Sequence, residues 1–553
     1  MSIDVLLINP PFRLVPPFQY KLIDPPRNLA LLAAVLLQKG YSVEILDMPI
    51  SGLDFDSIVM HIESCKPKII GISNRSTYSF PIVQKVATLI KARFPEIKII
   101  VGGTFVSFAP VEALEKEPNI DIIVIGEGEI TLSNLVEKIL NKEDISSLKG
   151  IAFRNLGEII RNEDSLIISD LSIIPLPALY LLPISKYVER NERYIIDISR
   201  GCMFGCSYCT SSYIKNRIRF RTKESVVSEL MTAYNLGFRN FYFFDDMFTA
   251  NKTLVLEICK EIVKENIKIK WPCMTRIDFI NSEILYWMKE AGCDLIAYGI
   301  ESTSQEYLKE IGKLNQLNKV EKVFNMTREY GIRPLAFVIS GLPKTKFHEE
   351  LETIKFLNQI RPDAVGVFSF KPYPGTKYYL NPDQNGIRIL DYNFSRWSQL
   401  DEPTHETEFL TKDEIIESMI LCNYLFRSGG TVSPGIKYRR RKNAIIIKTR
   451  EGGLIYNPYV PTEKRKTDMY LNCIKLDNEH FEILYRCDGY HNLNDISSIL
   501  EKLFDYSHEK ATERVNEIIK KAEDMNLIEE IPDVMNNMIP VETKAVIYGG
   551  GLV

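Results

Sequence analysis

The stretch Arg200–Thr210, RGCMFGCSYCT, contains three cysteines with C-x3-C-x2-C spacing between two glycines. A structural zinc site normally closes with four cysteine or histidine ligands, and no fourth one follows nearby, since the next cysteine is Cys259. Iron–sulfur clusters are held by thiolates on short loops, so they fit this spacing better. Three thiolates would leave one iron open, and an open metal position indicates catalysis rather than a structural role. The cysteines are Cys202, Cys206 and Cys209.

Six short β-rich runs, separated by helical stretches, lie between residues 190 and 395. Six such repeats predict a partial β/α barrel, in which catalytic groups gather at the carboxyl ends of the strands. Because the cysteine turn follows the first run directly, we expect the thiols at that rim. The runs are Tyr194–Ser199, Asn240–Phe244, Lys268–Met274, Asp294–Ile300, Pro334–Ser340 and Ala364–Phe370.

This motif resembles the hallmark of the radical S-adenosylmethionine (SAM) enzymes, C-x3-C-x-aromatic-C, with Tyr208 as the aromatic residue. The resemblance implies a [4Fe–4S] cluster on the three cysteines, whose open iron chelates SAM. One-electron reduction then cleaves SAM to a 5′-deoxyadenosyl radical, which abstracts a hydrogen atom. It also implies an electron donor such as flavodoxin or ferredoxin, and it places Tyr208 beside the adenine of SAM.

Later strand ends match the same family's pattern for holding SAM. FFDDMF and YGIES supply carboxylates, and MTRID offers an arginine to the SAM carboxylate, a fork-to-carboxylate pairing. Helix capping or turn solvation is the alternative for the acidic residues, and simple packing is the alternative for Tyr208. The candidate SAM residues, besides Tyr208, are Asp245, Asp246, Arg276, Glu301 and Ser302.

Strands and helices also alternate in the first 145 residues. Short connections between them predict a doubly wound, Rossmann-like parallel sheet, which binds ligands beyond the carboxyl ends of its strands. The predicted helices are Asn28–Lys39 and Ile82–Phe94. The predicted strands are Ile3–Ile8, Ser42–Leu46, Lys68–Ile72, Lys98–Val101 and Asp121–Ile125.

Four of these strands end in stretches rich in glycine or polar residues, where a flat or phosphate-bearing ligand could approach the backbone closely. Each stretch taken singly could be an ordinary turn, but four at four strand ends indicate a ligand site. The dinucleotide pattern G-x-G-x-x-G is absent. The stretches are NPPF (Asn9–Phe12), SNRS (Ser73–Ser76), GGT (Gly102–Thr104) and GEGE (Gly126–Glu129).

A sheet domain followed by this barrel resembles the cobalamin-binding subclass of radical SAM enzymes, over residues 1 to about 400, with VGGTFVS and IGEGEITL among the matching segments. The resemblance implies bound cobalamin. Arg75 is the candidate for facing the lower side of the cobalt, with a surface salt bridge as the alternative. The other candidate contacts are Asn9, Asn74, Ser76, Gly102, Gly103, Thr104, Gly126, Glu127 and Gly128.

Cobalamin mutases ligate cobalt through a D-x-H-x-x-G histidine, and this chain lacks that motif. His61 is the only histidine of the block and is expected on a helix as a surface or core residue. Many members of the radical subclass also lack the histidine, which implies an unliganded lower cobalt face. Loss of cobalamin from this domain is the alternative.

The chain beyond residue 433 has a different order of predicted elements. Two strands, Asn443–Lys448 and Leu454–Tyr456, precede three helices. This pattern suggests a small winged-helix-like domain. The segment His480–Leu500 resembles the recognition element of ribosomal-peptide maturases, related to the pyrroloquinoline quinone peptide chaperone. The resemblance implies that a precursor's leader peptide adds a strand to this sheet. The helices are Asp477–Arg486, Leu493–Phe504 and Glu509–Met525.

Bulk properties narrow the functional classes. The chain has 553 residues, and 68 basic against 72 acidic side chains give a net charge of -4, which argues against broad binding to nucleic acid. No run of eighteen apolar residues suggests a membrane span. The start, MSIDVLLINPPF, lacks a secretory signal, which predicts a cytoplasmic protein with reduced thiols. Few cysteines follow residue 380, so a single cluster is expected.

The expected organisation is a cobalamin-type domain at 1–145, a linker at 146–188, the barrel at 189–400, a helical linker at 401–432, the recognition domain at 433–533 and a tail at 534–553. These features predict cobalamin-dependent C-methylation of a ribosomally made precursor peptide at an unactivated carbon. Radical cyclisation, rearrangement or epimerisation of a peptide is the alternative. Modification of a nucleic-acid base is a further alternative, disfavoured by the charge balance.

Overall fold

The computed structural model describes residues 2–11, 23–211, 217–311, 313, 317–427, 437–440, 445–449, 452–456, 473–524 and 528–530. The predicted tail, 534–553, and Phe12 of the NPPF stretch lie outside them. The chain forms two compact units. The first takes in Met1–Thr353, Val365–Lys412 and Ile547–Val553, and the second takes in Ile354–Ala364 and Asp413–Val546.

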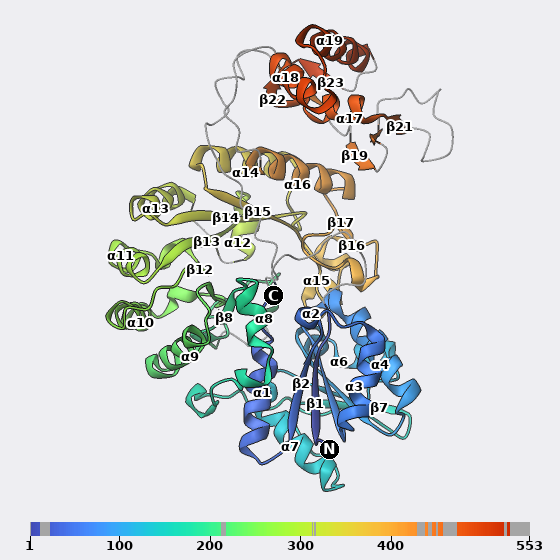
Figure 1. Ribbon diagram of the computed structural model, residues 1–553, viewed down its shortest axis with the longest axis vertical. Helices are drawn as coiled ribbons and strands as arrows, with labels where there is room; N and C mark the ends of the chain where they lie inside the picture. Colours follow the sequence, from blue (N-terminus) through green and yellow to red (C-terminus); the bar gives the residue numbers. More distant parts are fainter. Residues whose placement is uncertain are drawn as a thin grey trace. The chain divides into compact units, whose positions relative to one another are not determined.

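A seven-stranded sheet with the order β2-β1-β3-β4-β5-β6-β7 opens the first unit (Figure 1). Its first five strands pair in parallel, as predicted. A hairpin, β6 and β7, continues the sheet in antiparallel register at its edge, inside the stretch predicted as a linker. The strands are β1 (Val5–Asn9), β2 (Val43–Asp47), β3 (Ile69–Asn74), β4 (Lys98–Gly103), β5 (Ile122–Val124), β6 (Ile151–Asn155) and β7 (Glu158–Arg161).

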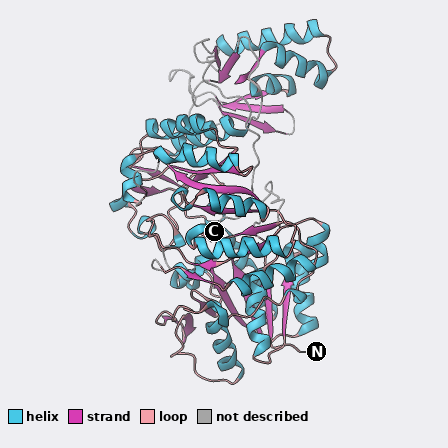
Figure 2. Ribbon diagram, turned by 90° about the vertical axis from the view of Figure 1, so that its left-hand side faces the viewer, coloured by secondary structure: helices cyan, strands magenta, loops and turns pink. Residues whose placement is uncertain are grey.

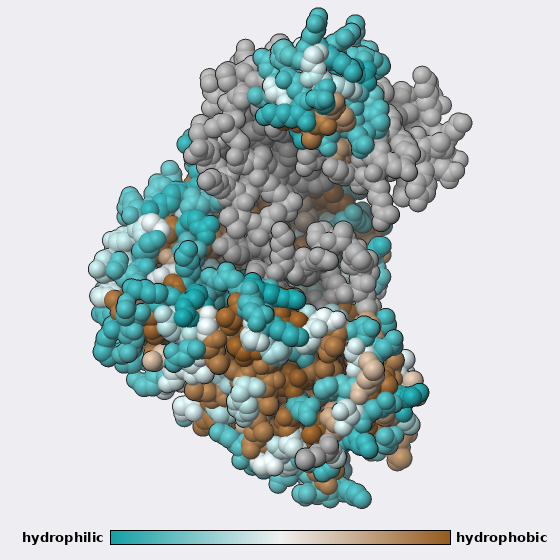
Figure 3. Space-filling view, viewed as in Figure 1, coloured by the Kyte–Doolittle hydropathy of each residue, from teal (hydrophilic) through white to brown (hydrophobic). Residues whose placement is uncertain are grey.

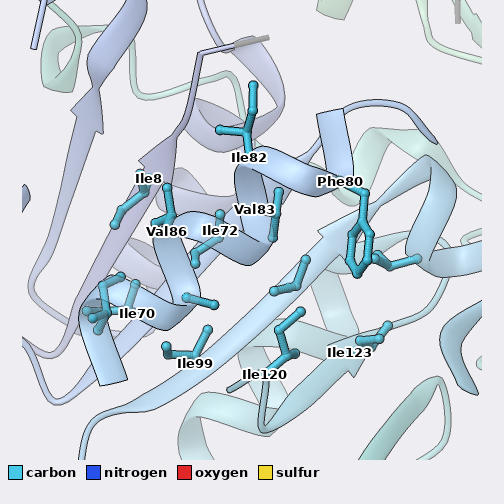
Figure 4. Close-up of a cluster of buried hydrophobic side chains, with 14 of the residues drawn as sticks. Ile8, Ile70, Ile72, Phe80, Ile82, Val83, Val86, Ile99, Ile120 and Ile123 are labelled. Carbon is cyan, nitrogen blue, oxygen red and sulfur yellow. The ribbon is translucent and has the colours of Figure 1, made fainter. Parts of the chain in front are cut away.

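Helices cover both faces of this sheet, so its strands are apolar on both sides. In β1, Val5 and Leu7 point into a core formed with α1 and α7, while Leu6 and Ile8 point into a second core. The second core lies beneath α3 and α4, and Figure 4 shows Phe80, Ile82, Val83 and Val86 of α4 among the sheet residues. The helices are α1 (Arg27–Gln38), α2 (Met48–Ser51), α3 (Phe55–Cys65), α4 (Phe80–Arg93), α5 (Thr104–Phe108), α6 (Pro110–Lys116) and α7 (Gly128–Leu140).

The six predicted barrel strands form one sheet with the order β15-β14-β13-β12-β11-β8. Its helices stand in a row along one side of the strands (Figures 1 and 2). This is the predicted partial barrel. The strands are β8 (Tyr194–Ile196), β11 (Phe241–Phe243), β12 (Trp271–Thr275), β13 (Cys293–Glu301), β14 (Arg333–Ser340) and β15 (Ala364–Ser369). The helices are α9 (Lys223–Asn235), α10 (Lys252–Lys264), α11 (Ser282–Glu290), α12 (Gln305–Glu310), α13 (Leu317–Glu329) and α14 (Phe347–Ile360).

Shorter elements connect these layers. Helix α8 (Ile184–Glu189) leads into β8, and β9 (Ser199–Arg200) pairs with β10 (Arg219–Phe220) in an antiparallel ladder. After β15 the chain forms α15 (Lys377–Leu380) and the antiparallel pair β16 (Ile387–Ile389) and β17 (His405–Thr407).

The second unit contains the three predicted helices, whose apolar faces form a common core. The prediction of two strands was incomplete, because the described residues form two three-stranded sheets, β22-β18-β23 and β19-β20-β21. The four additional strands are only three to five residues long, which is too short for a periodic pattern to mark them. The elements are α16 (Lys412–Arg427), α17 (Asn478–Tyr485), α18 (Leu493–Phe504), α19 (His508–Asp524), β18 (Lys437–Arg440), β19 (Ile445–Thr449), β20 (Gly452–Tyr456), β21 (Cys473–Leu476), β22 (Asp488–Asn492) and β23 (Ile528–Glu530).

No helix in the described part of the chain is both long and apolar enough to cross a membrane. On the face shown in Figure 3, apolar residues gather in the middle of the lower part, and polar residues cover the surface on either side.

Gly103, at the end of β4, gives a direct test of the sheet's carboxyl edge. Its φ of +126° is a backbone conformation that glycine adopts readily and other residues rarely do. An added Cβ would lie 2.0 Å from the backbone oxygen of Asn74. Gly103→Ala should therefore lower the free energy of unfolding by about 3 kcal/mol or more. Gly40→Ala is the matched control, because Gly40 also has a positive φ, +88°, but open space around it. It should cost about 1 kcal/mol. Calorimetric unfolding of the full chain compares the two, and equal costs would contradict the predicted clash.

Candidate functional site

The three cysteines lie on the loop that leaves β9 at Gly201, which has a φ of +86°. The Cys209 amide donates a hydrogen bond to the Cys206 carbonyl at 3.0 Å, and the Cys206 thiol lies 3.7 Å from the Ile311 carbonyl. Cys206 is buried, and Cys202 and Cys209 are partly exposed. The loop follows β9, which pairs with β10 in a short antiparallel ladder.

Charged groups from three later strand ends surround these thiols. Arg276, after β12, lies over the ring of Phe204 at 4.1 Å. Burial raises the pKa of the Cys202 and Cys206 thiols, and the positive charge of Arg276 offsets part of that rise. Asp246, after β11, accepts a hydrogen bond from Ser211 at 2.9 Å. The structure therefore brings Arg276 and Asp246 to the cysteine loop.

Glu301, after β13, is also near the loop, and it has a partner that sequence reasoning missed. Lys313 donates to the Glu301 carboxylate at 2.6 Å and to the Gly299 carbonyl at 3.1 Å. Both side chains are buried, and Lys313 lowers the pKa of Cys206 whereas Glu301 raises it. A positive φ of 64° at Glu301, within a register shift of β13, turns the chain at this point.

Burial raises the pKa of all three thiols, that of Cys209 to about 12. A buried thiol loses its proton when a nearby cation compensates the thiolate charge, and bound metal does this. Four zinc ligands at 2.3 Å would lie about 3.8 Å apart. Among the described residues, the three cysteine sulfurs do not form a set within 4.8 Å of one another. The loop therefore fits a cluster of several irons better than a single zinc ion.

Arg276 also fits the carboxylate of SAM. Its Nη2 donates to Asp278 at 3.1 Å, but its Nε is buried without a hydrogen-bond partner among the described residues. A buried donor without a partner costs free energy, so an anionic ligand beside the cysteine loop would satisfy it.

Other predicted SAM residues make local contacts within the protein. The Asp245 carboxylate accepts hydrogen bonds from the Ile198 and Ser199 amides and from the Ser199 hydroxyl, and burial raises its pKa to about 7. The Ser302 hydroxyl accepts from the Ser304 amide at 3.1 Å. Tyr208 packs against Tyr307, with ring centroids 6.5 Å apart. The Tyr208 contact is of the packing kind, whereas the Asp245 contacts join two strand ends, and a role in binding SAM stays a prediction for these residues.

Two asparagines end neighbouring strands of the first sheet. Asn9 donates to Asp47 at 2.9 Å, and Asn74 donates to the Ser76 carbonyl and to Ser79, both at 3.1 Å. The Oδ1 atom of each asparagine is buried without a hydrogen-bond partner among the described residues. Since the corrin ring of cobalamin carries amide side chains, whose N–H groups donate, this edge fits such a ligand.

The glycine-rich strand ends lie at the same edge. Gly102 and Gly103 end β4, and Thr104 begins α5. Gly126, with a φ of +76°, donates its amide to Ser107 at 2.9 Å, and Gly128 begins α7. The absence of side chains at the glycines leaves backbone accessible to a flat ligand.

Two candidate cobalamin residues carry charges that the protein itself engages. The Glu127 carboxylate pairs with Arg219 at 2.8 Å and with Arg200 at 3.4 Å. Arg75 is half-buried, and burial lowers its pKa although Asp24 raises it. Glu127 thus joins the first sheet to the β9–β10 ladder, in addition to any ligand contact.

A buried ion network, which sequence reasoning missed, joins the carboxyl ends of the two sheets. Arg27, at the start of α1, pairs with Asp197, after β8, at 2.9 Å and forks onto Glu229 of α9. Arg221 pairs with Glu229 at 2.8 Å, and Tyr194 donates to Glu229 at 2.8 Å. Burial pushes the pKa of Asp197 upward, but Arg27 and Arg221 hold it below its ordinary value. An adjoining cavity is lined by Arg27, Leu31, Leu171, Ile174, Pro175, Asp197, Arg200 and Arg221.

Two features of the sequence could have revealed this network. Arg27 is the first residue of α1, where the helix dipole disfavours a cation. Glu229 is a carboxylate among the buried apolar positions of α9, beside Leu230, where it is 1% exposed. Charges in such unfavourable positions indicate a tertiary partner.

A second contact joins the same two parts of the first unit. An added Cβ on Gly375, after β15, would lie 3.0 Å from Phe108, and Tyr379 donates to Glu112 of α6 at 2.7 Å. Tyr373 and Trp397 belong to the core beneath α4. The carboxyl edge of the first sheet therefore contacts both ends of the barrel sheet.

Comparisons with known proteins agree with this geometry. A model of the B12 binding domain matches residues 19–136, and a model of the radical SAM superfamily matches residues 196–357. An uncharacterised methyltransferase of Pyrococcus horikoshii is 29% identical over 74% of this chain and 89% of its own. An anaerobic magnesium-protoporphyrin IX monomethyl ester cyclase of Synechocystis sp. is 28% identical over 71% of this chain and 79% of its own.

The fold is similar to that of the radical SAM methyltransferase TsrM from Kitasatospora setae, solved with cobalamin and a [4Fe–4S] cluster. The TM-score is 0.61 at 18% identity, over 70% of this chain and 80% of TsrM. The chain thus combines a B12-binding domain with a radical SAM domain. Its domain content is that of a radical SAM enzyme with a B12-binding domain.

Removing Arg27 tests the network between the sheets. Arg27→Met would remove one of the two arginines that pair directly with the buried Asp197 and Glu229, and we expect a loss of about 3 kcal/mol in the free energy of unfolding. The control is Arg161→Met, which breaks an exposed pair with Asp164 at 2.6 Å. It should cost less than about 0.5 kcal/mol. Urea unfolding of the full chain, monitored by circular dichroism, measures both losses. Similar losses would mean that the buried network stabilises the fold no more than the exposed Arg161–Asp164 pair does.

Proposed function

We propose that this enzyme transfers a methyl group to an unactivated carbon of its substrate. The proposal is carried by the Arg27–Asp197 pair at 2.9 Å, because it joins the carboxyl edge of the B12-type sheet to that of the barrel. When bound, the cluster and SAM supply the radical that removes a hydrogen atom from the substrate, and cobalamin supplies the methyl group. Both kinds of chemistry must reach the same substrate carbon, which requires that the two edges meet.

The residues of the barrel rim bind and orient in this proposal. The thiolates of Cys202, Cys206 and Cys209 hold the cluster. Arg276 binds the carboxylate of SAM through its unpaired Nε, and Asp246 and Glu301 face its cationic and ribose groups. Lys313 neutralises Glu301 until those groups arrive, so that no carboxylate is buried without a partner.

The residues of the first sheet hold cobalamin in this proposal. The Oδ1 atoms of Asn9 and Asn74 accept hydrogen bonds from its amide side chains, and the glycine ends of β4 and β5 let the ring approach. Residues 1–136 contain a single histidine, His61, which lies on α3 rather than at this edge. Arg75 is the side chain assigned to the lower face of the ring.

A precursor peptide is the proposed substrate, recognised by the second unit. This unit contains two small sheets beside three helices, and the edge strands of such sheets can accept an added strand from a peptide. A small-molecule substrate is the second candidate, because the Synechocystis relative is named for a porphyrin ester. The same name favours ring closure as the alternative to methyl transfer. A cytoplasmic location and a flavodoxin or ferredoxin donor stay predictions.

Loss of one loop cysteine tests the cluster assignment. In anaerobically reconstituted enzyme, Cys209→Ala should lose the cluster absorbance and most of the iron, since two thiolates hold a cluster poorly. Formation of 5′-deoxyadenosine should fall below about one hundredth of the wild-type rate. Cys259→Ala, a buried cysteine of α10, is the control and should keep both. A Cys209 variant with full iron content would contradict the assignment.

Isotope labelling tests the reaction and the substrate class together. The holoenzyme is incubated with methyl-deuterated SAM, a reductant and either the peptide or the small-molecule fraction of a cell extract, and products are identified by mass spectrometry. We expect label in the peptide fraction, and none with Cys209→Ala. Label only in small molecules would refute the peptide substrate. Formation of 5′-deoxyadenosine with an unlabelled product two mass units lighter would refute methyl transfer in favour of cyclisation.

A further inference from the structure

A histidine, a cysteine and a glutamate meet on the outer part of the B12-type domain. Glu44 comes from β2, and His61 and Cys65 come from α3. One ligand atom from each, a carboxylate oxygen, an imidazole nitrogen and a thiol sulfur, lies within 4.8 Å of the other two. In the described part of the chain, this is the one group of three such side chains that is compact enough for a metal ion.

Local structure explains the meeting. His61 and Cys65 are four residues apart, so they lie one above the other on the same face of α3. Glu44 and Leu46 are two residues apart in β2, so their side chains point to the same face of the sheet. Leu46 belongs to the core beneath α3, and Glu44 therefore faces α3 as well. Because β2 is the edge strand of the sheet, its Glu44 side chain reaches the surface and is 43% exposed.

The His61–Glu44 contact is not an ordinary hydrogen bond. His61 Nε2 lies 3.2 Å from a Glu44 oxygen, yet it is shielded from solvent and has no hydrogen-bond partner among the described residues. Nitrogen and oxygen ligands on one tetrahedral zinc ion, each about 2.0 Å from the metal, are roughly 3.3 Å apart. The two atoms therefore already have the separation of two ligands on one ion.

The electrostatics around Cys65 also favour a cation. Cys65 is buried, and its sulfur lies within 4.8 Å of a Glu44 carboxylate oxygen. Cys65 is the last residue of α3, and the C-terminal end of a helix dipole attracts cations. A divalent ion would compensate the thiolate, the carboxylate and the helix end together.

The position separates this trio from the cofactor edge. Helix α3 ends at Cys65, four residues before β3 begins at Ile69, and the Cys65 carbonyl accepts the amide of Ile3, just before β1. The trio is therefore next to the amino ends of the parallel strands. The candidate SAM and cobalamin residues follow the carboxyl ends.

We propose that Glu44, His61 and Cys65 bind a zinc ion that fastens the edge strand β2 to the crossover helix α3. Cysteine, histidine and glutamate are all zinc ligands, and three protein ligands leave a fourth position for water or an added ligand. The ion holds β2, whose last residue, Asp47, accepts hydrogen bonds from Asn9 and Tyr187 at the cofactor edge. The site is independent of the proposed methyl transfer.

Metal analysis tests this proposal. The full-length enzyme is produced in cells grown with zinc and is loaded with the cluster and cobalamin before the analysis. We expect one zinc per chain that survives desalting. Glu44→Gln, His61→Gln and Cys65→Ser should each weaken zinc binding at least about tenfold in competition with a chromophoric chelator. Affinity should also fall with falling pH, since protons compete for the thiolate and the imidazole.

Two controls make the outcome decisive. Glu63→Gln changes an exposed carboxylate of the same helix, paired with Arg93 at 3.5 Å, and should keep the zinc. Cys202→Ala should lose iron but keep zinc, whereas loss of zinc with this variant would place the ion in the cluster loop and overturn the proposal. Glu44 is partly exposed, so Glu44→Gln tests the site even where Cys65→Ser destabilises the fold. Wild-type zinc retention in all three ligand variants would also overturn it.

Discussion

The buried ion network of Arg27, Arg221, Asp197 and Glu229 is the interaction on which the arrangement of the first unit depends. Its two cations and two anions balance, which is the condition for keeping charges away from water. Taking each ion out of water costs several kcal/mol, so such a network contributes more to specificity than to stability. It favours one relative orientation of the B12-type domain and the barrel, because Arg27 of the first domain pairs there with Asp197 and Glu229 of the barrel.

Each of the two sheets leaves some buried polar atoms without a hydrogen-bond partner among the described residues. At the barrel rim, the buried Nε atom of Arg276 has no partner within the described part of the chain, and the same holds for the buried Oδ1 atoms of Asn9 and Asn74 at the first sheet. Folded proteins satisfy nearly all buried polar atoms, so such exceptions indicate ligands. The Glu301–Lys313 pair shows the other solution, in which the protein supplies a partner of its own. The cofactor edge therefore contains buried polar atoms that a ligand would satisfy. His61 Nε2 is another such atom, near the amino ends of the strands.

The sequence determined the elements of the fold well where their patterns are local. The five parallel strands of the first sheet and the six of the barrel were predicted because each is a short apolar run between turn signals. The hairpin of β6 and β7, and the short strands of the second unit, lack that pattern and were not predicted. The cysteine spacing located the candidate cluster loop, because three ligands on one short loop form a local motif.

Tertiary structure decided which charges meet. Glu229 is a buried carboxylate whose partner, Arg27, is 202 residues away, and Lys313 contacts Glu301 from the far side of helix α12 in the sequence. His61 was expected to be an ordinary surface or core residue, because its partner Glu44 lies on a different element. Periodicity reports the burial of one element at a time, whereas ion pairs and metal ligands depend on how elements pack. By itself, the sequence determined the strands, the helices and the cysteine loop. Only the packing of those elements decided the charged contacts around the site, because these form between side chains distant in the chain.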